Sequence, residues 1–318
     1  MSPVLDASHD LAHPVEGNDA WSESYYFNLY DPDADCGFFT RIGVRPNQGT
    51  IDVGLSIWKP GGGLAHIRWM REQREMIDRD LEVGPVRYQL IEPLREWRLT
   101  ADGESTDGPV SMDVTFSALM PAIGADGQGS QGAGSSAETR QTVGKGHLEQ
   151  AGRWTGWIDV GGARAELGVD ARGNRDKSWG PRTWGGPKMW RWFSVNIGDD
   201  VHFGGIRIGT DAGDLHRGWV WKDGEHSSIT DWSVESELED DGVTHRMTHL
   251  VVTDKADRTH ELTGTILRVE PGPAGVRPDT TIVNEGLARW EYEGRTGYGI
   301  SEYLHQLDAA AQPKVPIE

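Results

Sequence analysis

The sequence is poor in the residues and motifs that mark metal, redox and hydrolase chemistry. Cys36 is its one cysteine, which excludes an intramolecular disulfide and every CxxC motif. Cys36 lies in an acidic turn, where a thiolate is disfavoured, so a catalytic thiol is poorly supported. His245 and His249 have the i, i+4 spacing of a helical zinc pair but no HExxH glutamate, and Ser178 lacks the G-x-S-x-G context of a serine hydrolase. We therefore expect no metal and no cofactor.

Positive charge and long apolar runs are scarce as well. The chain has 31 Lys and Arg against 50 Asp and Glu, a net charge of −19 at pH 7. Such a balance repels phosphate backbones and anionic lipids, so we expect no nucleic-acid partner. No window approaches the length of an apolar membrane span, and the first residues lack the basic and apolar regions of a secretory signal. The sequence predicts a cytoplasmic protein without membrane insertion and leaves its oligomeric state open.

Glycine and tryptophan, in contrast, are abundant. The chain contains 42 glycines and 14 tryptophans. Frequent glycines between short apolar segments are typical of an all-β chain with many turns. Each indole adds a wide apolar surface and one N–H donor, so this many favour a thick core or a large cavity.

Short segments of alternating bulky and polar residues recur along the whole chain. Residues 21–30, 38–45 and 50–58 are the clearest case and predict an antiparallel meander joined by short turns. Residues 64–80 fit either a helix or a strand. No amphipathic helix of convincing length is visible, so two consecutive antiparallel β-barrels or sandwiches are the expected fold.

One segment stands out as a linker. Residues 122–137 consist mainly of glycine, serine, alanine and glutamine, a composition typical of flexible chain. No apolar strand leads into this glycine run and no helix follows it, which argues against a phosphate-binding loop. We expect an N-terminal domain over residues 1–121, a linker over 122–140 and a C-terminal domain over 141–318.

The stretch Gly173–Arg182 concentrates chemistry in very few positions. It contains Arg175, Asp176, Lys177 and Arg182 together with Trp179, and Trp190 and Trp192 follow closely. Its glycines and prolines predict a loop that breaks any long strand. The combination suits the mouth or floor of an apolar cavity with a few fixed polar groups. Alternatively, Asp176 pairs with Arg175 or Arg182 in a purely structural role and the tryptophans are core residues.

Three carboxylates lie among aromatic residues: Glu23, Asp176 and Glu302. Apolar surroundings raise the pKa of a carboxyl group, so it can hold a proton near neutrality and act as a general acid. Aromatic walls can stabilise positive charge that develops on a protonated substrate. The alternative for Glu23 and Glu302 is a strand residue that pairs with a nearby arginine.

The residues of this stretch resemble a known superfamily. The sequence Gly-x-Arg-Asp-Lys-Ser-Trp-Gly-Pro-Arg at 173–182 is similar to the Gly-x-x-Asp-His-x-Trp-Gly segment of the AttH-like and carotenoid 1,2-hydratase proteins, above all to a bacterial branch with Arg-Asp-His-Ser-Trp-Gly-Pro-Arg. Residues 21–27, 147–150 and 297–303 resemble that branch too, so the resemblance covers about residues 14–308. It departs at Lys177, where the family usually has histidine.

The resemblance implies two tandem lipocalin-like (calycin) barrels and a hydratase or cyclase that needs no cofactor. The expected substrate is a hydrophobic terpenoid, steroid or polyketide-like small molecule. By position, Asp176 is the expected proton donor, with Glu23 as the other candidate, and Arg175 and Arg182 would orient Asp176 or bind a polar end of the substrate. The expected pocket-lining residues are aromatic or acidic: Trp21, Tyr26, Trp179, Trp190, Trp192, Glu302 and Tyr303. The competing hypothesis is a lipocalin-like carrier that binds an apolar molecule without chemistry.

Overall fold

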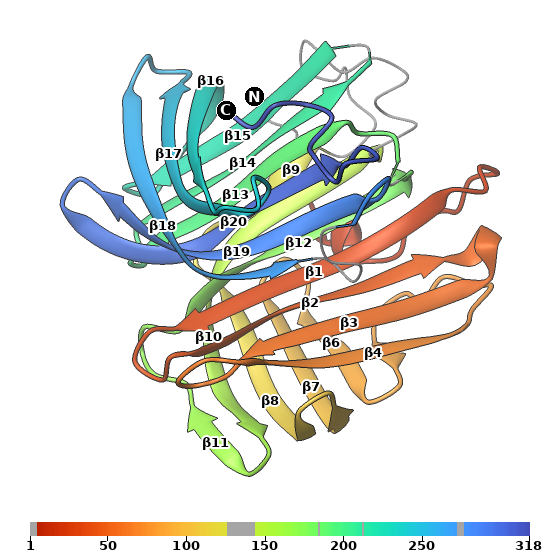
Figure 1. The fold of residues 1–318 in the computed structure, drawn as a ribbon. Helices are drawn as coiled ribbons and strands as arrows, with labels where there is room; N and C mark the ends of the chain where they lie inside the picture. Colours follow the sequence, from red (N-terminus) through yellow and green to blue (C-terminus); the bar gives the residue numbers. More distant parts are fainter. Residues whose placement is uncertain (1–4, 126–143, 184, 212, 272–276) are drawn as a thin grey trace. The chain divides into compact units, whose positions relative to one another are not determined.

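The computed structural model describes residues 5–125, 144–183, 185–211, 213–271 and 277–318. Apart from two short 3₁₀ helices, its regular elements are antiparallel strands, β1 to β20 (Figure 1). The chain divides into two compact units. Unit 1 holds the described residues up to 182, and unit 2 holds those from 183 onward. The expected all-β class with two barrel-like units is confirmed.

Unit 1 is one sheet of 12 strands. Its main path runs in the order β4-β3-β2-β1-β12-β10-β8-β7-β6-β5, and β9 and β11 pair with β10. The strands are β1 (Trp21–Asp31), β2 (Cys36–Arg45), β3 (Thr50–Trp58), β4 (Leu64–Glu72), β5 (Leu81–Val83), β6 (Val86–Glu92), β7 (Glu96–Ser105), β8 (Gly108–Ala118), β9 (Ile123–Ala125), β10 (Gly146–Val160), β11 (Ala163–Glu166) and β12 (Arg172–Pro181).

The sheet of unit 1 encloses a core of interlocked aromatic rings. Phe27 of β1 lies at its centre and meets Trp97, Phe116 and Trp154 edge to face, with ring centroids 5.7–6.1 Å apart. Trp97, Phe116 and Trp154 are fully buried. Edge-to-face pairs of this kind contribute about 0.5–1.5 kcal/mol each beyond the apolar area that they bury. Trp97 and Trp154 therefore fill the interior of this unit, as in the thick core that the abundance of tryptophan suggested.

The stretch predicted as a loop is a regular strand. β12 pairs with β1 on one side and with β10 on the other, so it lies in the middle of the sheet. Gly173 is required there because a Cβ atom would lie 1.9 Å from the carbonyl oxygen of Asn28. Gly180 has φ +115°, a conformation that favours glycine, and Pro181 ends the strand. Gly173 thus allows a close approach of two backbones, and Pro181 marks the end of the strand. The prediction of a loop over this stretch was wrong.

The division between the units also differs from the predicted one. β10 and β12 belong to the sheet of unit 1, in which β10 pairs with β8 and β12 pairs with β1. Unit 1 therefore extends to Arg182, and residues 141–182 do not belong to a C-terminal domain. The boundary was predicted from composition, at the glycine-rich segment. The strands that follow this segment, β10 and β12, still belong to the first sheet. Most of the predicted linker, residues 126–140, lies outside the described residues, and its first part includes β9.

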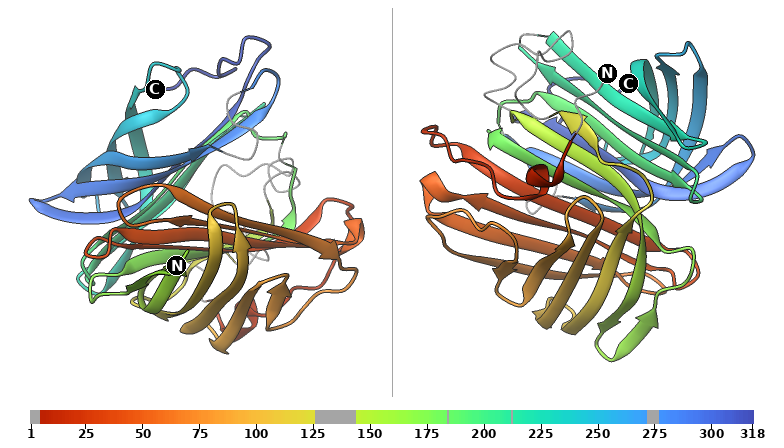
Figure 2. Two further views of the ribbon diagram at one scale, coloured as in Figure 1. Left: turned by 60° about the horizontal axis from the view of Figure 1, so that its bottom comes forward. Right: turned by 180° about the vertical axis from the view of Figure 1, so that it is seen from behind.

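The residues before β1 form an arm with a short helix rather than a purely extended segment. The 3₁₀ helix η1 (Ala7–Asp10) is capped by the side chain of Asp6, which accepts a hydrogen bond from the backbone N–H of Ser8. It is the dark red coil in the right-hand view of Figure 2. Asp10 is buried and Leu11 packs against the core of unit 1. A second 3₁₀ helix, η2 (Pro46–Gln48), joins β2 to β3.

Unit 2 is a closed barrel of antiparallel strands, drawn from green to blue in Figure 1. Its strands are β13 (Met189–Ile197), β14 (Val201–Thr210), β15 (Gly213–Lys222), β16 (Glu225–Leu238), β17 (His245–Asp254), β18 (Thr259–Pro271), β19 (Thr281–Tyr292) and β20 (Arg295–Gln306). β20 pairs with β13 and closes the barrel. Among the strands that the structure describes here, closure leaves none at a sheet edge.

The interior of the unit 2 barrel has an apolar part and a polar part. The apolar part contains Phe193, Phe203, Trp232 and Trp290.

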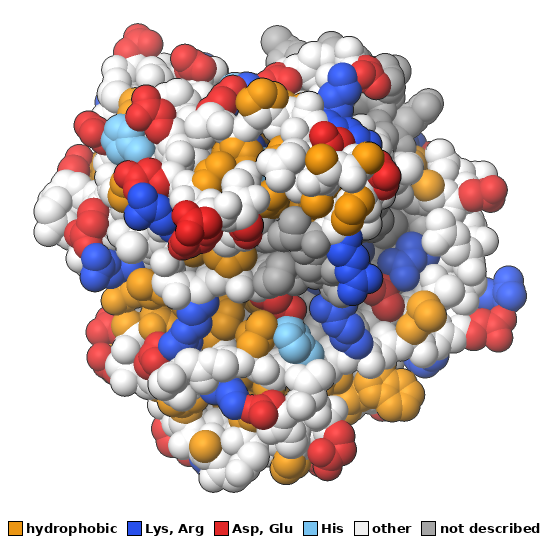
Figure 3. All heavy atoms as spheres, viewed as in Figure 1, with side chains coloured by type: hydrophobic (Ala, Val, Ile, Leu, Met, Phe, Trp, Pro, Cys, Tyr) orange, Lys and Arg blue, Asp and Glu red, His pale blue; other side chains and the backbone are white. Residues whose placement is uncertain are grey.

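On the face of the molecule shown in Figure 3, acidic and basic side chains are interspersed, as expected for the scattered acidic residues of the sequence. Among the described residues, no helix is long and apolar enough to cross a membrane.

Candidate active site

Strand β12 presents two different sets of side chains to the two faces of the unit 1 sheet. Successive residues of a strand point to opposite faces, so Arg175, Lys177 and Trp179 share one face and Asp176 and Ser178 share the other. The first set meets Tyr25 and Phe116 of the core, which makes it the inner face. Asp176 therefore lies on the outer face, apart from its sequence neighbours.

On the inner face, Glu23 is held in a buried ion pair. The side chains of Glu23 and Lys177 are 0% and 1% exposed, and Lys177 Nζ lies 2.6 Å from Glu23 Oε1. Lys177 also donates to the backbone carbonyls of His9 (2.8 Å) and Leu11 (2.7 Å). His13 donates its backbone N–H to Glu23 Oε2 at 3.0 Å, and its ring nitrogen Nδ1 lies 2.9 Å from Glu23 Oε1.

The pKa of Glu23 is lowered, contrary to the expectation for a general acid. Burial alone would raise it, but the hydrogen bond from His13 and the charge of Lys177 outweigh that effect. Glu23 is thus kept as a carboxylate that accepts hydrogen bonds from the arm and from β12. This arrangement holds the N-terminal arm on the sheet and makes Glu23 a structural residue.

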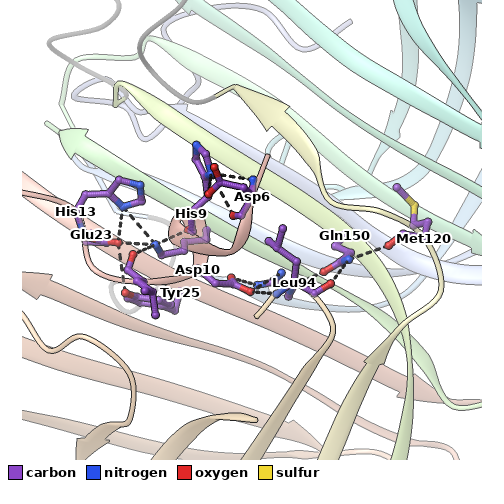
Figure 4. A network of polar contacts seen from close by, with 12 residues as sticks. Asp6, His9, Asp10, His13, Glu23, Tyr25, Leu94, Met120 and Gln150 are labelled. Atoms are coloured by element: carbon purple, nitrogen blue, oxygen red, sulfur yellow. Dashed lines mark hydrogen bonds and ion pairs between the residues drawn. The ribbon is translucent and has the colours of Figure 1, made fainter. Parts of the chain in front are cut away.

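Arg175 forms a second buried pair on the same inner face. Its guanidinium binds both carboxylate oxygens of Asp10, at 2.5 and 3.1 Å, and donates through Nε to Gln150 Oε1 at 2.8 Å. Gln150 in turn donates to the carbonyls of Leu94 and Met120, and Figure 4 shows the chain of contacts. The sequence had suggested that Arg175 orients Asp176. It does not, because the two side chains lie on opposite faces of the sheet.

Two of the expected aromatic residues also belong to this buried region. The indole of Trp179 stacks on the imidazole of His13, with ring centroids 3.8 Å apart and planes 8° apart. Trp179 is 4% exposed and Trp21 is 2% exposed. Both indoles point to the same face as Glu23 and pack within unit 1.

The outer face carries a compact group of titratable side chains that we call the acid triad: Asp176, His147 and Glu149. Asp176 and Glu149 are directly opposed on β12 and β10. The imidazole Nε2 of His147 contacts Asp176 Oδ2 and lies 3.6 Å from Glu149 Oε1. The side chains of His147, Asp176 and Glu149 are 36%, 17% and 6% exposed, so the group is reachable from solvent while one carboxylate is almost buried.

Polar residues of β1 and β2 continue this face. Tyr26 is the cross-strand partner of both Asp176 and Arg41. Arg41 donates through Nε to Ser24 Oγ at 2.7 Å, and burial lowers the pKa of its guanidinium to about 10. Arg182 directly follows β12, and its backbone N–H donates to the carbonyl of Ala20 at 2.9 Å. Of the predicted residues, Asp176 and Tyr26 thus share the outer face.

The acid triad can move protons. Two carboxyl groups that share one imidazole nitrogen can exist as an acid and a base side by side, with the imidazole as the group that transfers the proton between them. The same three residues offer ligand atoms within 4.8 Å of one another and could hold a divalent cation. Both possibilities use Asp176 together with His147 and Glu149.

Sequence reasoning missed two members of the triad. His147 and Glu149 lie two positions apart, so on a strand they share one face. That alternation was visible in the sequence, but the partner strand was not, because β12 was interpreted as a loop. Lys177 faces inward and pairs with Glu23, and the imidazole that contacts Asp176 belongs to His147 of β10.

The predicted residues of unit 2 also separate onto two faces. The indole Nε1 of Trp190 donates to Glu302 Oε1 at 2.6 Å, and Glu302 is the cross-strand partner of Trp192. Tyr303 instead bonds Ser236 of β16 (2.6 Å) and Thr248 of β17 (3.2 Å). Neither strand is a neighbour of β20 in the barrel, so the Tyr303 side chain crosses the interior. Trp190, Trp192 and Glu302 therefore lie on the outer face and Tyr303 does not join them.

Comparisons with known proteins agree with this architecture. A family model described as a domain of unknown function (DUF7064) matches residues 6–307. No curated protein matches the sequence. Among solved structures, the chain resembles a Nitrosomonas europaea protein described as an AttH, with 15% identity, a TM-score of 0.67 and coverage of 95% of this chain and 97% of that one.

Two further structures are similar. Kievitone hydratase from Nectria haematococca has 12% identity and a TM-score of 0.61, with 95% of this chain and 93% of that chain covered. CghA has 13% identity and a TM-score of 0.63, with 92% and 89% covered. The resemblance expected from the residues around Asp176 is thereby confirmed at the level of the fold, over nearly the whole length of these proteins.

Proposed function

We propose that this chain, which belongs to the DUF7064 family, is an acid–base hydratase or cyclase in which Asp176 protonates a hydrophobic small molecule. The contact of Asp176 with His147, beside Glu149, is the observation that carries this proposal. It supplies an acid, a base and a transfer group on a solvent-accessible face. Fold similarity to a protein named as a hydratase agrees with this choice.

The hydration step follows from the three groups. Protonated Asp176 gives its proton to one carbon of an alkene, and the electron pair of the double bond forms the new C–H bond. Water adds to the resulting cation at the other carbon and releases its extra proton to Glu149. His147 Nε2, next to both carboxyl groups, then takes the proton from Glu149 and returns it to Asp176. One water is added and the enzyme is unchanged.

A hydrophobic, electron-rich substrate such as a terpenoid, a steroid or a polyketide fits this chemistry best. A carbocation needs neighbours that stabilise positive charge without reacting with it, and aromatic rings do so. Tyr26 lies directly across from Asp176. In a cyclase the cation would be trapped by a second double bond of the substrate rather than by water.

A panel assay tests the proposal. The purified chain is incubated with acyclic terpenes, prenylated phenols and linear polyketides, and products are detected by mass spectrometry as a gain of one water or as an isomer. We expect wild-type turnover of at least one compound class, with Asp176→Asn and His147→Gln reduced by about 10²–10⁴-fold. Asp170→Asn, which removes a half-exposed carboxylate that pairs with Arg172, is the matched control and should leave turnover unchanged.

The carrier hypothesis makes the opposite prediction in the same assay. A carrier would bind one of these compounds, return it unaltered and bind it equally well as Asp176→Asn. Native mass spectrometry of the protein with the panel compounds distinguishes binding from turnover. Unchanged ligand throughout, or full turnover by folded Asp176→Asn, would overturn the proposed chemistry.

A further inference from the structure

One end of the unit 2 barrel interior is polar, and its residues take no part in the chemistry proposed for Asp176. We call this region the polar end. It consists of side chains from five strands that point into the barrel: Arg191, Arg207, Ser236, His245, Thr248, Tyr303 and His305.

Arg191 is a buried cation with few partners. It is 3% exposed, its NH1 group donates to the carbonyl of Trp190 at 2.8 Å, and its guanidinium lies 4.2 Å from the ring centroid of Tyr303. Within the described residues, no carboxylate forms an ion pair with it. Burying a charge without a counter-ion lowers the stability of the folded state. We therefore interpret Arg191 as a residue with a binding role.

A second arginine lies directly across from Arg191 on the neighbouring strand. Arg207 of β14 is its cross-strand partner, an arrangement in which like charges repel. Arg207 is neutralised by Asp214, at 2.7 Å, and by the side chain of Glu318 from the C-terminal segment. Glu318 also acts at a distance on the pKa of both Arg191 and Tyr303. A carboxylate thus already contacts Arg207 and lies close enough to Arg191 to influence it.

The uncharged members of the polar end complete an environment for an anion. The hydroxyl of Tyr303 is fixed by Ser236 and Thr248, and His245 stacks on the Tyr303 ring with planes 2° apart. Both ring nitrogens of His305 lack a hydrogen-bond partner, although the residue is 1% exposed. Burial lowers the pKa of His245 to about 4 and of His305 to about 3. Both imidazoles are therefore neutral at neutral pH. His245 uses its one N–H on the backbone carbonyl of Ser301 at 2.8 Å, so His305 is the imidazole that can donate a hydrogen bond to an anion without adding charge.

From this geometry we propose that the polar end is a second ligand site, which binds the carboxylate of a small organic acid between Arg191 and Arg207. The Glu318 side chain occupies part of this site when no ligand is bound, and the ligand competes with it. The site takes an anion of one negative charge attached to a small body, since apolar residues such as Phe193 and Trp232 fill the barrel beyond it.

Titration with benzoate and with its neutral isostere benzamide tests the site on the full-length chain. Isothermal titration calorimetry in low-salt buffer should detect benzoate and not benzamide. Glu318→Gln should bind benzoate at least fivefold more tightly, because the competing carboxylate is gone. Glu261→Gln removes an exposed carboxylate of unit 2 that pairs with His249, and this matched control should leave the benzoate affinity unchanged.

The variant Arg191→Met tests whether Arg191 is the cation that binds the benzoate carboxylate. The variant keeps the apolar volume of the arginine stem but loses the charge, so we expect benzoate affinity to fall at least tenfold while the unliganded midpoint of thermal unfolding stays equal or rises. If Arg191→Met is unfolded, the comparison of Glu318→Gln with Glu261→Gln decides alone. Equal binding of benzoate and benzamide, no benzoate binding by Glu318→Gln, or full binding by folded Arg191→Met would each overturn the proposal.

Discussion

At the scale of single residues, neighbours in sequence have different tasks. Asp176 and Lys177 are adjacent, yet Asp176 contacts His147 on the outer face while Lys177 binds Glu23 inside unit 1. The sequence showed which residues were chemically unusual but not which of them could meet. A strand interpretation of residues 172–181 would have separated the two sets by alternation alone.

The buried pair of Glu23 and Lys177 yields the first prediction. Lys177→Met leaves the Glu23 carboxylate buried without its ammonium partner and should lower the free energy of unfolding by about 3–5 kcal/mol. Adding Glu23→Gln removes the orphaned charge and should restore most of the loss. Urea unfolding of the wild type, both single variants and the double variant measures the coupling, and a double variant that is as unstable as Lys177→Met would contradict this account.

The buried histidines of unit 2 yield a prediction on pH. The ordinary histidine pKa of 6.5 is lowered to about 4 in His245 and about 3 in His305, mainly by burial. The unfolded chain therefore takes up protons below about pH 6.5 that the folded chain refuses, and stability falls as the pH decreases toward about 4. Each histidine contributes a slope of about 1.4 kcal/mol per pH unit in that window.

Unfolding free energies between about pH 7 and pH 5 test this slope. His305→Leu removes one of the two buried imidazoles and should flatten the curve by about half of their joint contribution. An unchanged slope in a folded His305→Leu variant would mean that another group controls the acid sensitivity.

At the scale of elements, the success of the sequence analysis depended on how the glycines and prolines were interpreted. Strands with strict alternation, such as β1 and β3, were predicted close to their observed bounds. β12 was missed because Gly173, Gly180 and Pro181 were interpreted as breakers of a strand. The requirement for glycine at 173 arises from β1, which lies far away in the sequence, so no local pattern could reveal it. The boundary between units failed for the same reason, since β10 and β12 pair with strands formed more than thirty residues earlier.

Glycine substitutions test the packing of β12 against β1. A Cβ atom at Gly173 would lie 1.9 Å from Asn28 O and 2.9 Å from the indole nitrogen of Trp154. Gly173→Ala should therefore force the strands apart and destabilise the chain by about 3 kcal/mol. Gly54→Ala is the matched control, because Gly54 is also a strand residue and a Cβ there would have nothing within 4 Å. Similar thermal midpoints for the two variants would refute the close approach.

At the scale of the whole molecule, each unit has its own core and its own polar interior groups. Unit 1 buries the Asp10–Arg175 and Glu23–Lys177 pairs beneath its N-terminal arm. Unit 2 closes its barrel through β13 and β20. The division of the chain at Arg182 rather than in the glycine-rich segment follows from strand pairing.

Fragments of the chain test this division. Residues 1–182 contain every strand of the unit 1 sheet and should fold cooperatively, with near-ultraviolet circular dichroism from the ordered tryptophans. Residues 1–140 lack β10 and β12, so β1 and β8 each lose one of their two partner strands and the sheet is split in two. This fragment should not give a cooperative transition. A stable fold of residues 1–140 would restore the boundary suggested by composition.

The most direct test of the central claim is deuterium transfer to carbon. A compound that the wild type converts in the panel assay is incubated in D₂O with wild type, Asp176→Asn and Asp170→Asn, and the product is analysed by NMR. If Asp176 is the acid, wild type and Asp170→Asn place one non-exchangeable deuterium on the carbon next to the new hydroxyl-bearing or ring carbon, and Asp176→Asn forms no labelled product. Equal labelling by a folded Asp176→Asn variant would show that the proton comes from elsewhere and would contradict the assignment of the acid triad as the active site.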